Sequence, residues 1–127
     1  MRYANGLSLS EYALTPTLLH PGALLTVTTI WLPERRPAAD LNISLQILDE
    51  AANKIAQQDL SPLPSRWAIN QPVTLTHLLA IAPDAPPGVY RLLLIWYAPS
   101  DFARLPAYDA QGQFAGDQIM LTRLRVR

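Results

Sequence analysis

The stretch from Ala82 to Ala98, APDAPPGVYRLLLIWYA, constrains the fold of this chain more than any other. Its prolines stiffen a turn, and the following ten residues, Gly88–Tyr97, predict one long β-strand. Successive side chains of a strand point to opposite faces. We expect one face to contribute four large side chains to the core, those of Tyr90, Leu92, Leu94 and Trp96.

Apolar residues also alternate elsewhere, and turn signals recur at intervals of about ten residues. The clearest alternation is in Leu41–Asp49, where polar side chains such as Ser44 and Gln46 share the outward face. The threonine-rich stretch Ala23–Leu32 also favours a strand. Further strands are expected at Gly6–Leu14, where Leu7, Leu9 and Glu11 share a face, and at Ile55–Asp59, Val73–Ile81 and Asp117–Arg127.

The connections between these strands also carry signals. Asp49–Lys54 predicts a hairpin turn, and Ser61–Gln71 is expected to cross between sheets. The long segment Pro99–Gly116 is expected to hold a small hairpin at Asp109–Gly112, because aspartate caps backbone amides and glycine accepts a positive φ. Together these elements predict an all-β fold: an immunoglobulin-like or fibronectin-like antiparallel two-sheet sandwich of about seven strands.

Composition agrees with one sandwich domain spanning residues 1–127. Half of the residues are hydrophobic and 16% are charged, so a core can form without disulfides, and there is no cysteine. Ten basic and ten acidic residues cancel, so no global field favours nucleic acid. The longest apolar run, Leu92–Ala98, is far shorter than the roughly 20 residues of a membrane span. We expect no span within this chain.

Motifs for metal or catalytic chemistry are absent from the sequence. There is no H-x-x-x-H pair, and Asp101, Asp109 and Asp117 recur too far apart for a calcium loop. No G-x-S-x-G frames a nucleophile, and nothing selects a carboxylate pair. We therefore expect a protein that is not an enzyme and has no metal or cofactor. His77, on an otherwise apolar face, is expected to bond to a neighbouring residue.

The aromatic residues offer the main candidate ligand site. Trp31, Tyr90 and Trp96 are expected in the core, with Tyr90 tying the proline turn to its strand as a tyrosine corner. Aromatic rings that are exposed can stack on sugar rings. Trp67 has two interpretations: it either contacts such a ligand or closes the open edge of the sandwich. The candidate platform consists of Arg66, Trp67, Tyr97, Phe102 and Tyr108.

The outward side of Gly88–Tyr97 is the second candidate site. It is apolar where a solvated face would be polar, and only Arg91 interrupts it. If the segment Pro99–Gly116 does not cover it, the face forms an apolar patch typical of an interface. The candidate interface residues are Val89, Leu93, Ile95 and Tyr97.

Four stretches of the chain carry a resemblance to a known family: HPGALLTVTTIWL, LQILDEAANKIAQQD, PPGVYRL and RLPAYDAQGQFAGDQIML. Over about Leu7 to Val126, the chain resembles the C-terminal, extracytoplasmic β-sandwich domain of bacterial multi-spanning membrane proteins. Many of those proteins resemble glycosyltransferases of the mannosyltransferase type that use lipid-linked sugars. Two positions depart from the family. Ala52-Asn53 replaces Asp-Gly in the first hairpin, where Asn tolerates the left-handed conformation, and His77 replaces an aromatic residue.

The resemblance implies a non-catalytic accessory domain, for assembly or recognition, that is a fragment of a longer membrane protein and lies outside the cytoplasm. Its partner would then be the membrane domain of that parent. One alternative is a carbohydrate-binding module that holds a glycan on the exposed aromatics. A further alternative is a stand-alone small protein that dimerises with a second copy through the apolar strand face.

Overall fold

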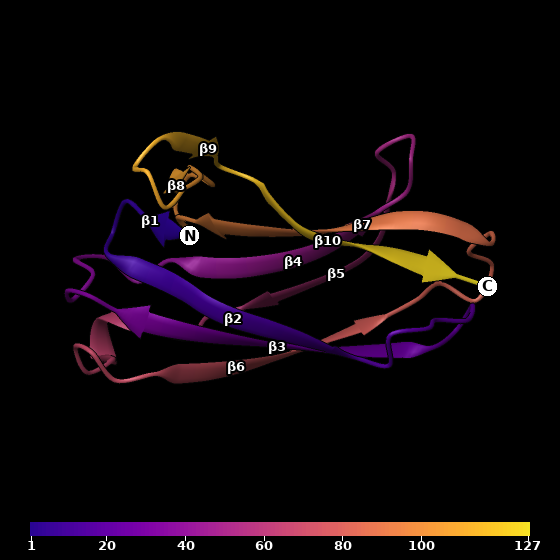
Figure 1. Cartoon of the computed structure of the whole chain (residues 1–127), viewed down its shortest axis with the longest axis horizontal. Coiled ribbons are helices and arrows are strands. Elements are labelled where there is room, and N and C mark those ends of the chain that lie inside the picture. The colour runs from indigo at the N-terminus through magenta and orange to yellow at the C-terminus, as the bar shows by residue number, and fades with distance from the viewer.

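The computed structural model describes residues 1–127 as two antiparallel sheets packed face to face (Figure 1). The six-stranded sheet has the order β6-β3-β2-β1-β8-β9, and the four-stranded sheet has the order β10-β7-β4-β5. The predicted all-β sandwich is therefore confirmed. The strands are β1 (Arg2–Tyr3), β2 (Leu7–Thr15), β3 (Leu24–Pro33), β4 (Asn42–Leu48), β5 (Lys54–Leu60), β6 (Val73–Ala80), β7 (Gly88–Tyr97), β8 (Ala107–Tyr108), β9 (Phe114–Gly116) and β10 (Ile119–Val126).

Strand β7 has the predicted bounds and lies inside the four-stranded sheet, between β4 and β10. The six other strands of seven residues or more, β2 to β6 and β10, correspond to the six other predicted strands. The two-residue strand β1 was not predicted. It pairs with β2 and β8 and so extends the larger sheet.

The core between the sheets is centred on aromatic rings from both of them. The four predicted inward side chains of β7 are at most 3% exposed. Trp96 meets Trp31 of β3 edge to face, with ring centroids 5.2 Å apart, and the ring of Tyr3 also packs against Trp31 at 5.7 Å. Edge-to-face contacts add to the burial of these large rings, so β3 and β7 are held together across the sandwich.

The expected face of β2 is only half right. Leu7 is buried, but a β-bulge lies between Leu9 and Glu11, and Glu11 is exposed. The extra residue in a bulge reverses the alternation beyond it. Tyr12 therefore pairs with the inward-facing Thr29, and its hydroxyl donates a hydrogen bond of 2.6 Å to the carbonyl oxygen of Leu121 in the other sheet.

Two predicted turns form, with one difference. Asp109 accepts hydrogen bonds from the backbone amides of Gln111 and Gln113, and Gly112 has φ +77°, as expected. In the β4–β5 turn, Ala52 takes the left-handed conformation, with φ 67°, in place of Asn53. The reason is that Asn53 is held by Asp49, which accepts from its backbone and side-chain amides.

The tyrosine corner is also confirmed. The Tyr90 hydroxyl donates a hydrogen bond of 2.5 Å to the carbonyl oxygen of Pro86 and so ties the proline turn to β7. The one helical element is a short 3-10 helix, η1 (Pro64–Arg66), in the connection from β5 to β6. No helix of the protein has the length and apolar character needed to cross a membrane.

Candidate binding site

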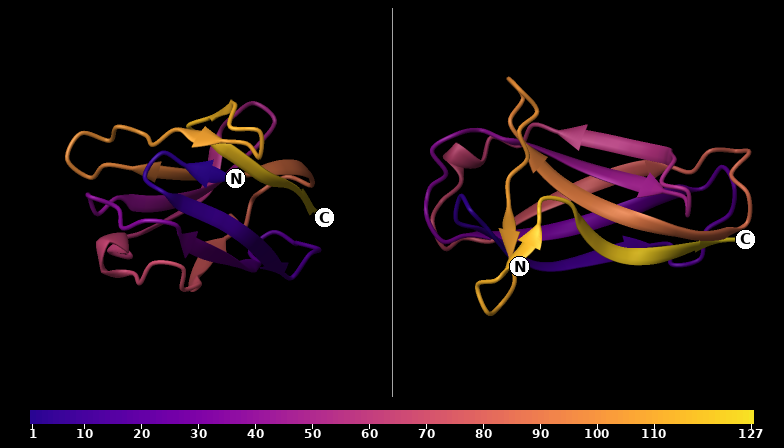
Figure 2. Two further views of the ribbon diagram at one scale, coloured as in Figure 1. Left: turned by 60° about the vertical axis from the view of Figure 1, so that its left-hand side comes forward. Right: turned by 90° about the horizontal axis from the view of Figure 1, so that it is seen from above.

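The outer face of the four-stranded sheet is seen from above in the right panel of Figure 2. It carries a cluster of polar side chains joined by hydrogen bonds. The register sets its outward residues in rows across the strands. Asp59, Ser44 and Ile95 form one row on β5, β4 and β7. Gln57, Gln46 and Leu93 form the next. Because the register of three strands brings these residues together, spacing along the sequence alone does not show the cluster.

Asp59 is the centre of this cluster. Its Oδ1 accepts hydrogen bonds from the Ser44 hydroxyl at 2.7 Å and from the Gln57 side-chain amide at 2.8 Å. Its Oδ2 accepts from the Tyr97 hydroxyl at 2.5 Å. Four outward side chains from three strands are thus fixed in one arrangement, which a ligand meets already formed.

The hydrogen bonds determine the charge of this cluster. Burial on its own would raise the pKa of Asp59, but the donors Tyr97, Ser44 and Gln57 together lower this pKa below its ordinary value. The same bond to Asp59, followed by burial, raises the pKa of Tyr97. At neutral pH the site therefore holds a carboxylate beside a neutral phenol. Both groups retain oxygen lone pairs that can accept hydrogen bonds from a ligand.

Aromatic rings form one wall of the site. The rings of Tyr97 and Phe102 are stacked, with centroids 6.0 Å apart and planes 26° from parallel. Phe102 has φ 61° and is 72% exposed, so its ring presents a large apolar surface to solvent. A shallow pocket of about 170 Å³ lies between this pair, Arg104 and the Asp59 cluster. Exposed aromatic surface next to fixed polar groups is typical of a ligand site.

The predicted platform does not form as a unit, because Trp67 belongs to the core. It is 9% exposed, its ring meets Trp96 edge to face at 6.4 Å, and its indole N–H donates to the carbonyl oxygen of Pro62 at 3.2 Å. This burial agrees with the interpretation of Trp67 as a plug and makes its proposed contact with a ligand wrong. Arg66 beside it is exposed but is not among the residues around the pocket.

Tyr108 is also separate from the pocket. It lies on β8 in the other sheet, where its ring meets Phe114 edge to face at 6.2 Å. Of the five predicted platform residues, only Tyr97 and Phe102 line the pocket together. Their polar partners Asp59, Ser44 and Gln57 were not predicted, although the alternation of polar residues on β4 includes Ser44.

The predicted apolar patch on β7 is not exposed. Leu93 and Ile95 are each 3% exposed, while Val89 and Tyr97 are half-buried. Gln46 and Met120 flank Leu93 in the register, whereas Ile95 pairs with the short Ser44 and lies beside Phe102 and Arg104 of the segment Pro99–Gly116. The exposed apolar patch on which the interface prediction depended is therefore absent. A second copy as partner stays a prediction without this patch to support it.

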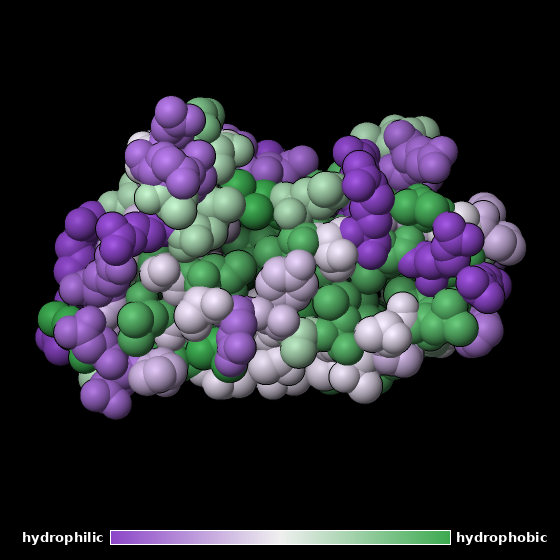
Figure 3. Space-filling view, in the orientation of Figure 1, coloured by the Kyte–Doolittle hydropathy of each residue, from purple (hydrophilic) through white to green (hydrophobic).

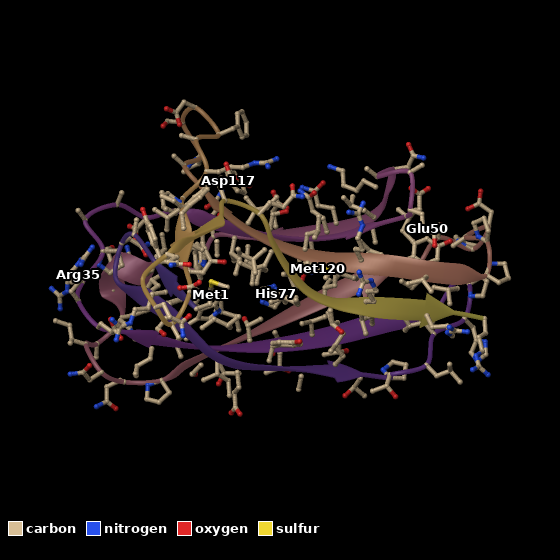
Figure 4. The ribbon with its side chains drawn as sticks, turned by 45° about the horizontal axis from the view of Figure 1, so that its top comes forward. Met1, Arg35, Glu50, His77, Asp117 and Met120 are labelled. Atoms are coloured by element: carbon tan, nitrogen blue, oxygen red, sulfur yellow. The ribbon has the colours of Figure 1, made fainter.

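His77 forms a buried polar network inside the sandwich (Figure 4). Its Nε2 lies 2.9 Å from the hydroxyl of Thr29, which also accepts the indole N–H of Trp31 at 2.8 Å. Burial lowers the pKa of His77 from 6.5 to about 4. The predicted bond to a neighbour is confirmed, and the side chain is fully buried.

An apolar groove of about 410 Å³ runs between β2 and β10, lined by residues such as Leu9, Tyr12 and Met120. No three His, Cys, Asp or Glu side chains gather as metal ligands, and Asp101, Asp109 and Asp117 do not form such a group.

Comparison with known proteins gives a likeness of fold. No protein-family model matches the chain, and no curated protein matches it by sequence. Among solved structures, it is similar to the crystal structure of the C-terminal domain of Wzt, with a TM-score of 0.62 and 14% sequence identity. The likeness covers 98% of this chain and 75% of that one. At this identity, it shows a shared β-sandwich fold.

Proposed function

We propose that this β-sandwich is a non-catalytic recognition domain that binds a glycan on the outer face of its four-stranded sheet. One observation carries the proposal: the stacked pair Tyr97 and Phe102 borders a carboxylate, Asp59, which three hydrogen bonds hold in place. A sugar ring has an apolar face that packs on aromatic rings and hydroxyl groups around its edge. The pocket offers both kinds of partner side by side.

The polar groups match the hydroxyl groups of a sugar. The Asp59 carboxylate has about four acceptor positions, of which three are taken, so one is left for a ligand hydroxyl. Arg104 also lines the pocket and adds donors, one of which bonds Gln118 at 3.2 Å. Neutral hydroxyl groups both donate and accept, so they can use this mixed set without a charge of their own.

Binding is better supported than hydrolysis. Glycoside hydrolysis usually needs two carboxyl groups across the scissile bond, one of them with a raised pKa. Asp59 is the only carboxylate that lines the pocket, and its pKa is lowered. The pocket is also shallow, at about 170 Å³, and resembles a surface for holding a chain more than an enclosed reaction cleft.

The proposal extends to the larger protein in which such a domain would act. We place it as an accessory domain of a glycosyltransferase-like membrane protein, outside the cytoplasm, as the family resemblance implies. The structural neighbour is itself a C-terminal domain, which agrees with a sandwich of this kind being appended to a longer chain. In that setting, the glycan face would recognise the sugar chain that the parent makes or transfers.

A glycan microarray followed by calorimetric titration tests the binding site. We expect at least one glycan to bind. Tyr97→Ala or Phe102→Ala should reduce its affinity roughly tenfold, which corresponds to about 1.4 kcal/mol of binding free energy. Tyr108→Ala is the matched control, since it removes a tyrosine ring of the other sheet. Failure to bind any glycan, or equal binding by all three variants, would overturn the proposal.

A further inference from the structure

Cationic side chains cross the other end of the proposed glycan face. Arg91 on β7 pairs directly with Arg123 on the edge strand β10. On its other side, Arg91 pairs with Leu48, which pairs in turn with Lys54 on β5. Arg125 lies one row further along β10. Since the alternate residues of β10 such as Leu124 are buried, these arginines point outward.

No acidic side chain forms a salt bridge with this row, although Arg91 lies close enough to Asp49 to help the hydrogen bonds from Asn53 lower the pKa of that carboxyl. The two salt bridges of the protein use Arg2 and Arg104, which are elsewhere. Arg91 Nε is buried without a hydrogen-bond partner, and one terminal nitrogen of Arg91 reaches only the backbone oxygen of Asp49, at 3.4 Å. The Asp49 carboxylate itself bonds Asn53. Lys54 donates to the side chain of Gln57.

Both features are unfavourable in the free protein. Like charges directly opposite each other on neighbouring strands repel. A buried donor without a partner loses its hydration and gains nothing in return. An anionic group between Arg91 and Arg123 relieves the repulsion, because it lies between two guanidinium groups and can accept from several of their N–H donors.

The spacing connects this row to the aromatic pocket. The Ile95 row, which contains Asp59, lies four positions along β7 from the Arg91 row, or about 13 Å at the usual rise of a strand. Gln57 and Gln46 lie between the two rows. The outline of the molecule rises at the β4–β5 turn and at the β8–β9 hairpin and falls between them (Figure 3). An extended chain on this face can therefore contact both ends of it.

We infer that the glycan bound on this face is acidic, and that a carboxylate, sulfate or phosphate group on it is held between Arg91 and Arg123. The inference rests on the proposed function and adds the chemical class of the ligand. Tyr97 and Phe102 hold a sugar ring at one end. The arginine pair selects glycans that carry a negative charge a short distance along the chain.

The test compares acidic polysaccharides with their neutralised forms. Each acidic glycan that binds on a microarray is titrated beside its carboxyl-reduced, desulfated or dephosphorylated derivative. We expect the neutralised form to bind at least about tenfold more weakly. Arg123→Ala should reduce binding of the acidic form to a similar extent and leave binding of the neutral form unchanged. Arg123 is exposed on an edge strand, so this variant should fold normally.

Arg36→Ala is the matched control, because it removes an exposed arginine of the β3–β4 loop, away from this sheet face. If acidic and neutral glycans bind equally and Arg123→Ala changes neither affinity, the inference of an acidic ligand is wrong and the proposed function stands. Absence of any glycan binding overturns both. Binding to vesicles of phosphatidylglycerol, without glycan binding, would assign the arginine row to a lipid surface and also overturn the inference.

Discussion

The hydroxyl of Tyr97 lies 2.5 Å from Oδ2 of Asp59, although the two residues are 38 positions apart. The bond passes over β4 and links the aromatic end of β7 to the edge strand β5. It lowers the pKa of the acid and raises the pKa of the phenol, so it is strongest when Asp59 is ionised. The architecture of the proposed site depends on this bond.

Asp59→Asn should lower stability by about 1 kcal/mol at neutral pH, after allowance for solvent screening of this partly exposed group. The folded-state pKa of Asp59 lies below its unfolded value of about 3.9. Its contribution is therefore complete above that value and is lost as pH falls through the folded pKa. Urea unfolding should show a constant difference between the proteins above about pH 5 and a shrinking one below about pH 4. A difference that grows on acidification would contradict the ionised cluster.

His77 should make the stability of the protein depend on pH in a range above that of Asp59. Burial lowers its pKa to about 4, so the unfolded chain binds a proton that the folded protein excludes. Stability should fall by roughly 3 kcal/mol as pH drops from about 6.5 to about 4. In His77→Phe, this part of the pH dependence should be absent. Parallel urea-midpoint curves for the two proteins across this window would contradict a buried neutral histidine.

Trp67→Ala should destabilise the protein by about 3 to 5 kcal/mol, the usual cost of removing a buried tryptophan. The indole packs on Trp96 and donates to Pro62, so its loss leaves both a cavity and an unpaired carbonyl. Thermal unfolding measures the effect, with Phe114→Ala as a control because Phe114 is 67% exposed. A loss below about 1 kcal/mol would place Trp67 outside the core.

Tyr90→Phe removes only the hydroxyl that holds the proline turn. We expect a loss of about 1 kcal/mol, since the hydrogen bond to the Pro86 carbonyl disappears while the ring stays buried. Chemical denaturation is sensitive enough for this change. Unchanged stability would mean that the turn is held by its prolines alone.

Much of the fold could be predicted from the sequence because apolar side chains recur at every second residue of a strand that is buried on one face. The bounds of β7 and the side facing the core followed from that period and from the proline turn. The bulge after Leu9 could not be predicted, since the inserted residue leaves no local signal in the alternation. The left-handed Ala52 depends on a side-chain bond between Asp49 and Asn53.

The site was less predictable than the fold. Tyr97 and Phe102 could be predicted as ligand-binding residues because aromatic rings near the long loop can stack on sugars. Asp59 and Ser44 join them only through the pairing of three strands. The burial of Leu93 also depends on its neighbours across the sheet, Gln46 and Met120, and Ile95 lies beside the loop residues Phe102 and Arg104. A single sequence contains no information on register of that kind.

The most direct test of the account is an amide-resolved NMR titration of the labelled domain with a glycan that binds on the array. We predict that the shifted signals cluster on the outer face of the four-stranded sheet, at Ser44, Gln57, Asp59, Tyr97 and Phe102. With an acidic glycan, the shifts should extend to Arg91 and Arg123. Shifts confined to the groove between β2 and β10, around Tyr12 and Leu121, would contradict the proposed site.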